Sequence, residues 1–121
     1  MSQEVAIFFH GCPDRAQDWL PFAGALKNQT GMDFIIPDLI EMKKEMRGYR
    51  RKNVILQALK KLSEIDPERK KRVFVFGHDI GGIYAWELSR MLGDRLAGLI
   101  SINGPALEMM KMRLTDFSQL K

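Results

Sequence analysis

The chain has 121 residues, 45% of them hydrophobic and 28% charged, a composition that predicts one globular domain with a modest core and argues against disorder. Its formal charge of +4 is concentrated in two basic runs, residues 43–52 and 69–72, without aromatic residues interleaved at stacking intervals, so solvated turns are expected rather than a nucleic-acid surface. One cysteine excludes an internal disulfide, no metal-ligand spacing occurs, and no apolar stretch is long enough to cross a bilayer. We therefore expect a cytoplasmic protein with no cofactor, no metal and no membrane span.

Four short apolar runs predict the strands of a sheet. They are rich in Val, Ile and Phe and lack polar alternation, which is typical of parallel strands buried on both faces. These runs are residues 5–9, 34–36, 73–76 and 96–102.

Helical patterns separate the predicted strands. After the first strand, an apolar stripe with helical spacing is formed by Trp19, Phe22, Ala23 and Leu26. Asp18 is placed to cap this helix, and Pro21 still falls within the first turn, where proline is tolerated.

The second and third helices follow the second and third strands. The second has one apolar face, made by Val54, Ile55, Ala58, Leu59 and Leu62, and Asp66-Pro67 ends it. The third covers residues 83–92 and stops at Gly93-Asp94. This alternation predicts a doubly wound α/β layer, with a mainly parallel sheet of about four strands flanked by helices. A last helix, with Leu107, Met110 and Leu114 on one face, is predicted after Pro105.

A glycine-rich turn directly follows the third predicted strand and opens a helix. It is formed by Gly77, His78, Asp79, Ile80, Gly81 and Gly82. This strand–turn–helix context is that of a nucleophile elbow, written here with aspartate in place of serine. The glycines allow a tight turn, and Asp79 is aimed at a pocket near a helix N-terminus whose dipole favours its anionic form.

A second turn, formed by His10, Gly11, Cys12 and Pro13, follows the first strand. Together the two turns resemble those of the α/β-hydrolase superfamily. The resemblance implies an oxyanion hole made by the backbone N–H groups of Cys12 and Ile80, with the other residues of both turns in support. Pro37-Asp38-Leu39 and Arg47-Gly48-Tyr49 look like the two halves of a further family turn, split by residues 40–46.

With aspartate at the elbow, the chain resembles epoxide hydrolases and haloalkane dehalogenases. In both enzyme classes a carboxylate attacks carbon and forms an ester. Dehalogenases place side-chain donors for the halide at the positions of Ile80 and Cys12, and neither residue supplies one. The resemblance therefore favours an epoxide hydrolase-like enzyme with a small apolar substrate such as an epoxide.

The same resemblance implies an acid and then a histidine after the nucleophile, yet no histidine follows Asp79. His10 and His78 are interpreted as structural residues. We therefore expect residues 1–104 to be a partial α/β-hydrolase core, residues 105–121 to start a cap or lid, and the chain alone to be inactive. A haloalkane dehalogenase-like enzyme and a non-catalytic remnant that binds a partner through its sheet edge stay open as alternatives, as do self-association and a completing chain.

Overall fold

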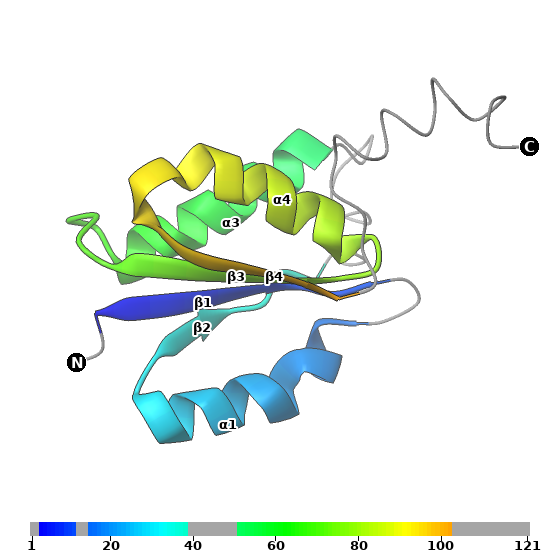
Figure 1. The fold of residues 1–121 in the computed structure, drawn as a ribbon, viewed down its shortest axis with the longest axis horizontal. Helices are drawn as coiled ribbons and strands as arrows, with labels where there is room; N and C mark the ends of the chain where they lie inside the picture. Colours follow the sequence, from blue (N-terminus) through cyan, green and yellow to red (C-terminus); the bar gives the residue numbers. More distant parts are fainter. Residues whose placement is uncertain (1–2, 12–14, 39–50, 103–121) are drawn as a thin grey trace, which may run out of the picture.

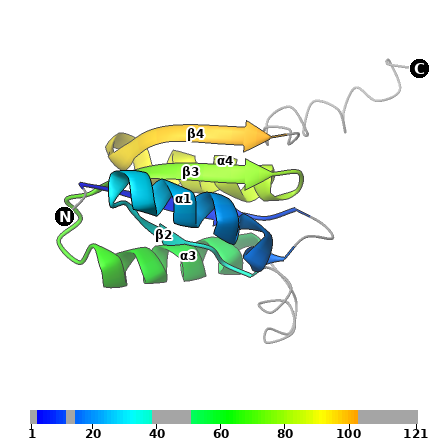
Figure 2. The ribbon, with the colours of Figure 1, turned by 90° about the horizontal axis from the view of Figure 1, so that it is seen from below.

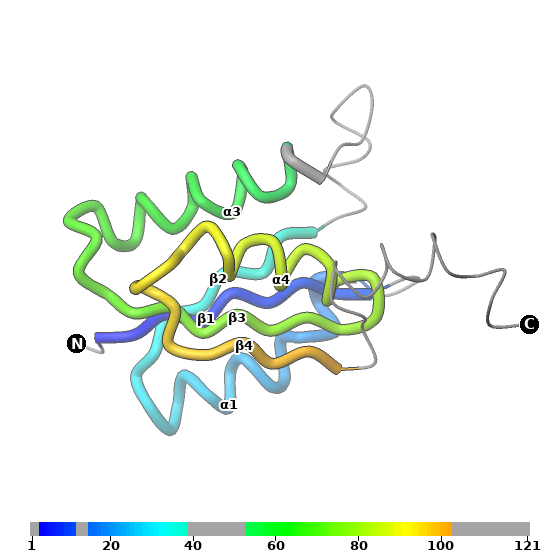
Figure 3. Tube along the Cα trace, turned by 45° about the horizontal axis from the view of Figure 1, so that its top comes forward, coloured from blue at the N-terminus to red at the C-terminus, as the bar shows by residue number. Residues whose placement is uncertain are grey.

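The computed structural model describes residues 3–11, 15–38 and 51–102. Within them, four strands form one sheet in the order β2-β1-β3-β4, and every neighbouring pair is parallel (Figures 1 and 3). The strands are β1 (Glu4–Phe9), β2 (Asp33–Ile35), β3 (Arg72–His78) and β4 (Leu96–Ile102). Each begins and ends within two residues of its predicted position, and the parallel sheet confirms the predicted fold class.

Helices cover both faces of this sheet. One face carries α1 (Leu20–Thr30), while α3 (Arg51–Ile65) and α4 (Gly81–Leu92) lie together on the other (Figures 1 and 2). Two short 3-10 turns, η1 (Ala16–Trp19) and η2 (Gly93–Arg95), precede α1 and β4. The chain therefore winds from β1 in one direction and from β3 in the other, as a doubly wound layer requires.

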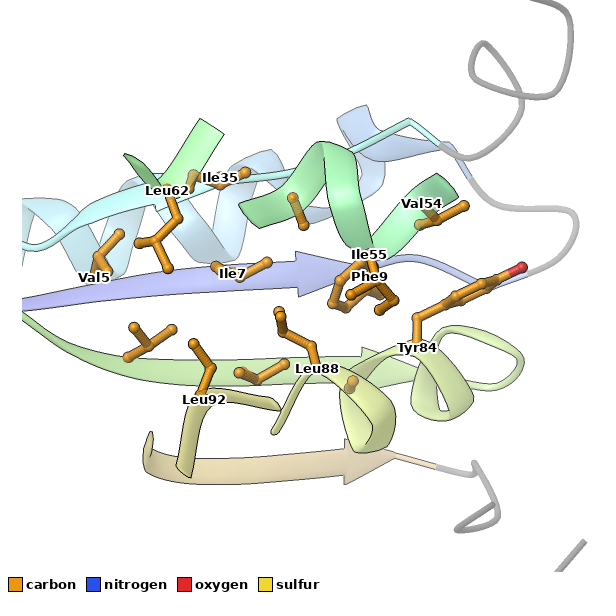
Figure 4. Close-up of a cluster of buried hydrophobic side chains, with 14 residues drawn as sticks. Val5, Ile7, Phe9, Ile35, Val54, Ile55, Leu62, Tyr84, Leu88 and Leu92 are labelled. Atoms are coloured by element: carbon orange, nitrogen blue, oxygen red, sulfur yellow. The ribbon is translucent and has the colours of Figure 1, made fainter. Parts of the chain in front are cut away.

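The larger core lies between the sheet and the pair α3 and α4, as Figure 4 shows. Alternate residues of each strand face it, because successive side chains of a strand point to opposite faces. The apolar face predicted for α3 is confirmed, since four of its residues are buried in this cluster and the fifth, Leu59, packs against it. The buried strand and helix residues of the cluster include Val5, Ile7, Phe9, Val73, Val75, Val54, Ile55, Ala58, Leu62, Tyr84 and Leu88.

A smaller aromatic core lies between the sheet and α1. The fully buried Phe8 ring stacks on Phe76 with centroids 4.6 Å apart and contacts Trp19 at 4.9 Å. Phe22 meets the edge of Phe76 at 5.7 Å, but half of its surface stays exposed. The apolar stripe predicted for this helix therefore faces the sheet. The helix covers only part of this face of the sheet, so Phe22 stays half exposed.

Two local predictions were wrong. Asp18 lies inside η1, where its carboxylate accepts a 2.7 Å hydrogen bond from the Arg15 backbone N–H, and Trp19 occupies the cap position of α1. The extra 3-10 turn moves the helix start past Asp18. The strand at residues 96–102 was expected to be buried on both faces, but Ile100 and Ile102 are 36% and 44% exposed. In the order β2-β1-β3-β4 of the described residues, this strand is an edge of the sheet.

The turn before β3 holds one of the two basic runs. Arg69 has a left-handed φ of 57°, and its side chain is exposed, as are those of Lys70 and Arg72. This run is the solvated turn that the sequence predicted. Most of the other basic run lies outside the described residues, as does the predicted cap segment 105–121.

Candidate active site

The carboxyl ends of β1 and β3 lie side by side in the middle of the sheet. Phe9 is paired with Gly77, so the turns that follow the two strands are neighbours. After β1 the chain leads to α1 on one face, and after β3 it leads to α4 on the other. Such a switch point is where ligands bind in open α/β sheets. The fold thus brings together the two turns that the sequence analysis selected.

Asp79 has a backbone conformation that residues with side chains seldom adopt. Its φ is 55°, in the left-handed region. Its N–H donates to the Ile102 carbonyl at 2.9 Å, which ties the turn to β4, and its own carbonyl accepts from the Gly82 N–H at 2.9 Å. The Asp79 side chain is exposed. Asp79 is thus a strained residue between a strand and a helix with an accessible side chain, which is what the predicted nucleophile elbow requires.

Three glycines allow the close approach of backbone around Asp79. A methyl group on Gly77 would lie 2.6 Å from the Gly81 carbonyl oxygen, and one on Gly81 would overlap the carbonyl oxygen of Phe9. A methyl group on Gly11 would lie 2.9 Å from the Asp79 Cβ atom. Gly11 therefore packs directly against the candidate nucleophile, and a side chain at any of these three positions would force neighbouring atoms to move.

Of the two backbone N–H groups that were predicted to form the oxyanion hole, only that of Ile80 lies among the described residues. Ile80 caps the N-terminus of α4, and its side chain is 42% exposed. The hydrogen bonds of the elbow use the N–H groups of Asp79, Gly82 and Ile83, and the Ile80 N–H is not a donor among the described residues. This N–H stays available for an oxyanion beside Asp79. Cys12 and Pro13 lie outside the described residues, so the second donor stays a prediction.

The two histidines have different surroundings. His10 is only 2% exposed, and its Nδ1 atom lies 2.9 Å from the Gly11 carbonyl oxygen. His78 is partly buried and lines an open pocket on the α1 side of the sheet. A buried ring beneath the oxyanion turn fits the structural role expected of His10, because substrate has little access to it.

Asp38 and Arg15 were not assigned to the site by the sequence analysis, although they lie beside the oxyanion turn. One Asp38 oxygen accepts a 3.0 Å hydrogen bond from Arg15 Nε, and the other lies 3.9 Å from His10 Nε2. The signal in the sequence was the placement of Asp38 shortly after the second strand. Carboxyl ends of neighbouring parallel strands meet at one edge of a sheet, so such a residue falls near the end of β1.

The pocket next to the elbow has a volume of about 340 Å³. It lies on the α1 side of β3 and β4 and does not include the Asp79 side chain in its lining. Its walls are mainly apolar and aromatic, and they are formed by Asp18, Trp19, Phe22, Phe76, His78, Ile100 and Ile102. The elbow backbone borders it, because His78 and Ile102 flank the hydrogen bond that holds Asp79.

The described parts of the chain contain neither a candidate metal centre nor a candidate membrane-spanning helix. No group of three or more histidine, cysteine, aspartate or glutamate side chains there could hold a metal ion. No helix in the same parts combines the length and the apolar character that crossing a membrane requires.

Comparison with known proteins supports the fold. No protein-family model matches the chain, and no curated protein matches it. Among solved structures, it is similar to the crystal structure of a histidine-to-alanine variant of PytH, with a TM-score of 0.59 and 19% sequence identity. The match covers 84% of this chain and 40% of the PytH chain. At this identity the likeness shows a shared α/β fold. This chain spans less than half of the length of the PytH chain.

Proposed function

We propose that the chain carries the nucleophile half of an α/β-hydrolase active site, in which Asp79 opens an epoxide. The observation that carries this proposal is the left-handed φ of 55° at Asp79, an exposed carboxylate held between a strand and a helix. Strain of this kind persists only where surrounding structure enforces it, and it concentrates at functional sites. Here the Ile102 hydrogen bond and the packed glycines enforce it.

The first step is an attack at carbon. One Asp79 carboxylate oxygen bonds to a ring carbon of the epoxide, the bond from that carbon to the ring oxygen breaks, and the resulting alkoxide takes a proton from water. The product is a hydroxyalkyl ester of Asp79. Its carbonyl oxygen lies near the Ile80 N–H, where negative charge would be stabilised when water later attacks that carbonyl.

The second step needs a general base to activate this water. His10 is buried, His78 lines the pocket on the α1 side, whose lining does not include Asp79, and the 121-residue sequence has no histidine after Asp79. We therefore propose that this chain by itself forms the ester but releases diol very slowly. The missing acid and histidine would have to come from another segment or another chain.

Trapping of the ester tests the proposal. The chain is incubated with a small aryl epoxide and digested with trypsin, and the peptide of residues 73–90, which contains Asp79 and Glu87, is analysed by mass spectrometry. We expect one added epoxide mass on Asp79, removable by hydroxylamine because the link is an ester. Asp79→Asn should abolish the adduct, while Glu87→Gln, the matched control in the same peptide, should keep it.

The outcome also separates the alternatives. An adduct formed with a bromoalkane but not with the epoxide would favour the haloalkane dehalogenase-like reaction. Equal labelling of Asp79 and other exposed carboxylates, or no labelling at all, would remove the nucleophile assignment. The non-catalytic binding role, which the exposed edge strand β4 favours, would then be the better proposal.

A further inference from the structure

The Asp38 carboxylate connects two segments of the chain that flank the oxyanion turn. Asp38 follows β2, which pairs with β1, so it lies beside His10 at the end of β1. One oxygen faces His10 Nε2 at 3.9 Å. The other accepts from Arg15 Nε at 3.0 Å and from the Ala16 backbone N–H at 3.4 Å. His10 is the first residue of the turn, and Arg15 and Ala16 lie shortly after its last residue.

The three side chains that make these contacts are partly or fully buried. The side chain of His10 is 2% exposed, that of Asp38 21% and that of Arg15 35%. A partly buried, charge-assisted hydrogen bond is shorter and stronger than a neutral one, and salt screens it less than a surface pair. The Asp38 carboxylate therefore holds the segment after the turn through its hydrogen bond with Arg15, and it lies against the His10 ring on the other side of the turn.

The position of the turn matters for chemistry because Gly11 touches the nucleophile. Gly11 follows His10, and its Cα hydrogen side faces the Asp79 Cβ so closely that a methyl group there would lie 2.9 Å away. The His10 ring also contacts the Gly11 carbonyl at 2.9 Å. Groups at a reactive centre must be held within about 0.5 Å to be effective, and supporting residues behind them supply this precision.

We propose that Asp38 is a positioning residue, which acts through His10 and Arg15 to set the backbone of the Gly11 turn against Asp79. This inference rests on the proposed function, because the consequence of the positioning is the rate at which Asp79 attacks carbon. Asp38 does not touch the reacting atoms. Its removal lowers the maximal rate of ester formation and leaves the apparent affinity for the epoxide nearly unchanged.

The test compares Asp38→Asn with Asp33→Asn in the full chain. Asp33 is the matched control, since it also belongs to the β2 segment and pairs with a basic residue, Lys27, at 3.2 Å, but far from the turn. The rate of adduct formation on Asp79 is measured against the concentration of the aryl epoxide, well below the melting temperature. We expect a maximal rate lowered about tenfold or more in Asp38→Asn, and within twofold of wild type in Asp33→Asn.

Amide hydrogen exchange provides a second measurement that does not depend on reactivity. In Asp38→Asn, exchange should accelerate by about tenfold over residues 10–16 and stay unchanged over residues 73–77. A purely structural role would instead raise exchange across both segments or leave the labelling rate intact. An unchanged maximal rate in both Asp38→Asn and Asp38→Ala would overturn the inference. If wild type forms no adduct, the nucleophile assignment fails, and exchange over residues 10–16 alone decides whether Asp38 holds the turn.

Discussion

At the scale of single residues, close backbone packing around Asp79 makes particular glycines necessary. Gly81 faces the carbonyl groups of Phe9 and His10, which are backbone atoms and cannot rotate away. Gly24 lies in the middle of α1 and has open space where a methyl group would be added. The two residues are therefore suited to a direct comparison.

Gly81→Ala should lower the free energy of unfolding by about 3 kcal/mol, because the added methyl group forces α4 away from the end of β1. Gly24→Ala should raise it by about 0.5 to 1 kcal/mol, since alanine loses less conformational freedom in a helix than glycine does. Urea denaturation of both variants measures the two changes. Equal stability of the variants would contradict the packing of the elbow against β1.

At the scale of elements, one buried carboxylate at the end of α3 joins the turn before β3 to η2, which leads into β4. Asp66 is 4% exposed and accepts hydrogen bonds from the Lys70 and Lys71 N–H groups at 3.0 and 2.9 Å and from the Arg95 guanidinium at 2.7 Å. Burial by itself raises the pKa of Asp66, but these hydrogen bonds and the Arg95 charge outweigh it, and the pKa lies below its ordinary value.

A lowered pKa in the folded state makes the contribution of Asp66 to stability depend on pH. The contribution is fully present above the pKa of about 3.9 of an unfolded aspartate and is lost as the pH falls through the lower folded value. Asp66→Asn should therefore be clearly less stable than wild type at pH 7, and the gap should narrow below about pH 4. Asp94→Asn, which changes an exposed aspartate beside Arg95, should show little gap at any pH in the same urea titrations. A pH-independent gap for Asp66→Asn would count against the hydrogen-bonded carboxylate.

At the scale of the whole molecule, the outer edge of β4 and the apolar surface beside it are open. Among the described residues no strand pairs with that edge, and Phe22, Ile100 and Ile102 expose 50%, 36% and 44% of their surface next to it. The strand contains no charged residue or proline of the kind that protects natural edges. An unprotected apolar edge favours association with further chains.

We expect the average mass of the chain in sedimentation velocity to rise with concentration. Ile102→Lys should suppress this rise, because it places a charge in the exposed surface beside the edge. Leu56→Lys is the matched control, since Leu56 is 48% exposed on α3, away from β4, and it should associate as wild type does. A monomer at every concentration would show that this edge is protected in another way.

Much of the fold could be predicted because its elements follow local rules. The apolar face of α3 has the period of a helix, and the runs of β1 and β3 have the short length and the Val, Ile and Phe content of buried strands. The end of α3 before Asp66-Pro67 and the stop of α4 at Gly93 depend on neighbouring residues alone. How much of Ile100 and Ile102 stays exposed could not be predicted, because it depends on how far the helices cover the outer strand of the sheet.

The candidate site divides in the same way. The sequence by itself predicted the elbow, since its glycines and aspartate are contiguous and their spacing after a strand reflects a local turn. Only the tertiary structure decided that Gly11 touches Asp79, that Asp38 lies between His10 and Arg15, and that Asp18 belongs to a 3-10 turn. These relations depend on the pairing of β1 with both β2 and β3, which joins residues distant in the chain. Local propensity does not predict such strand pairing, because the pairing results from burying the faces of several elements at once.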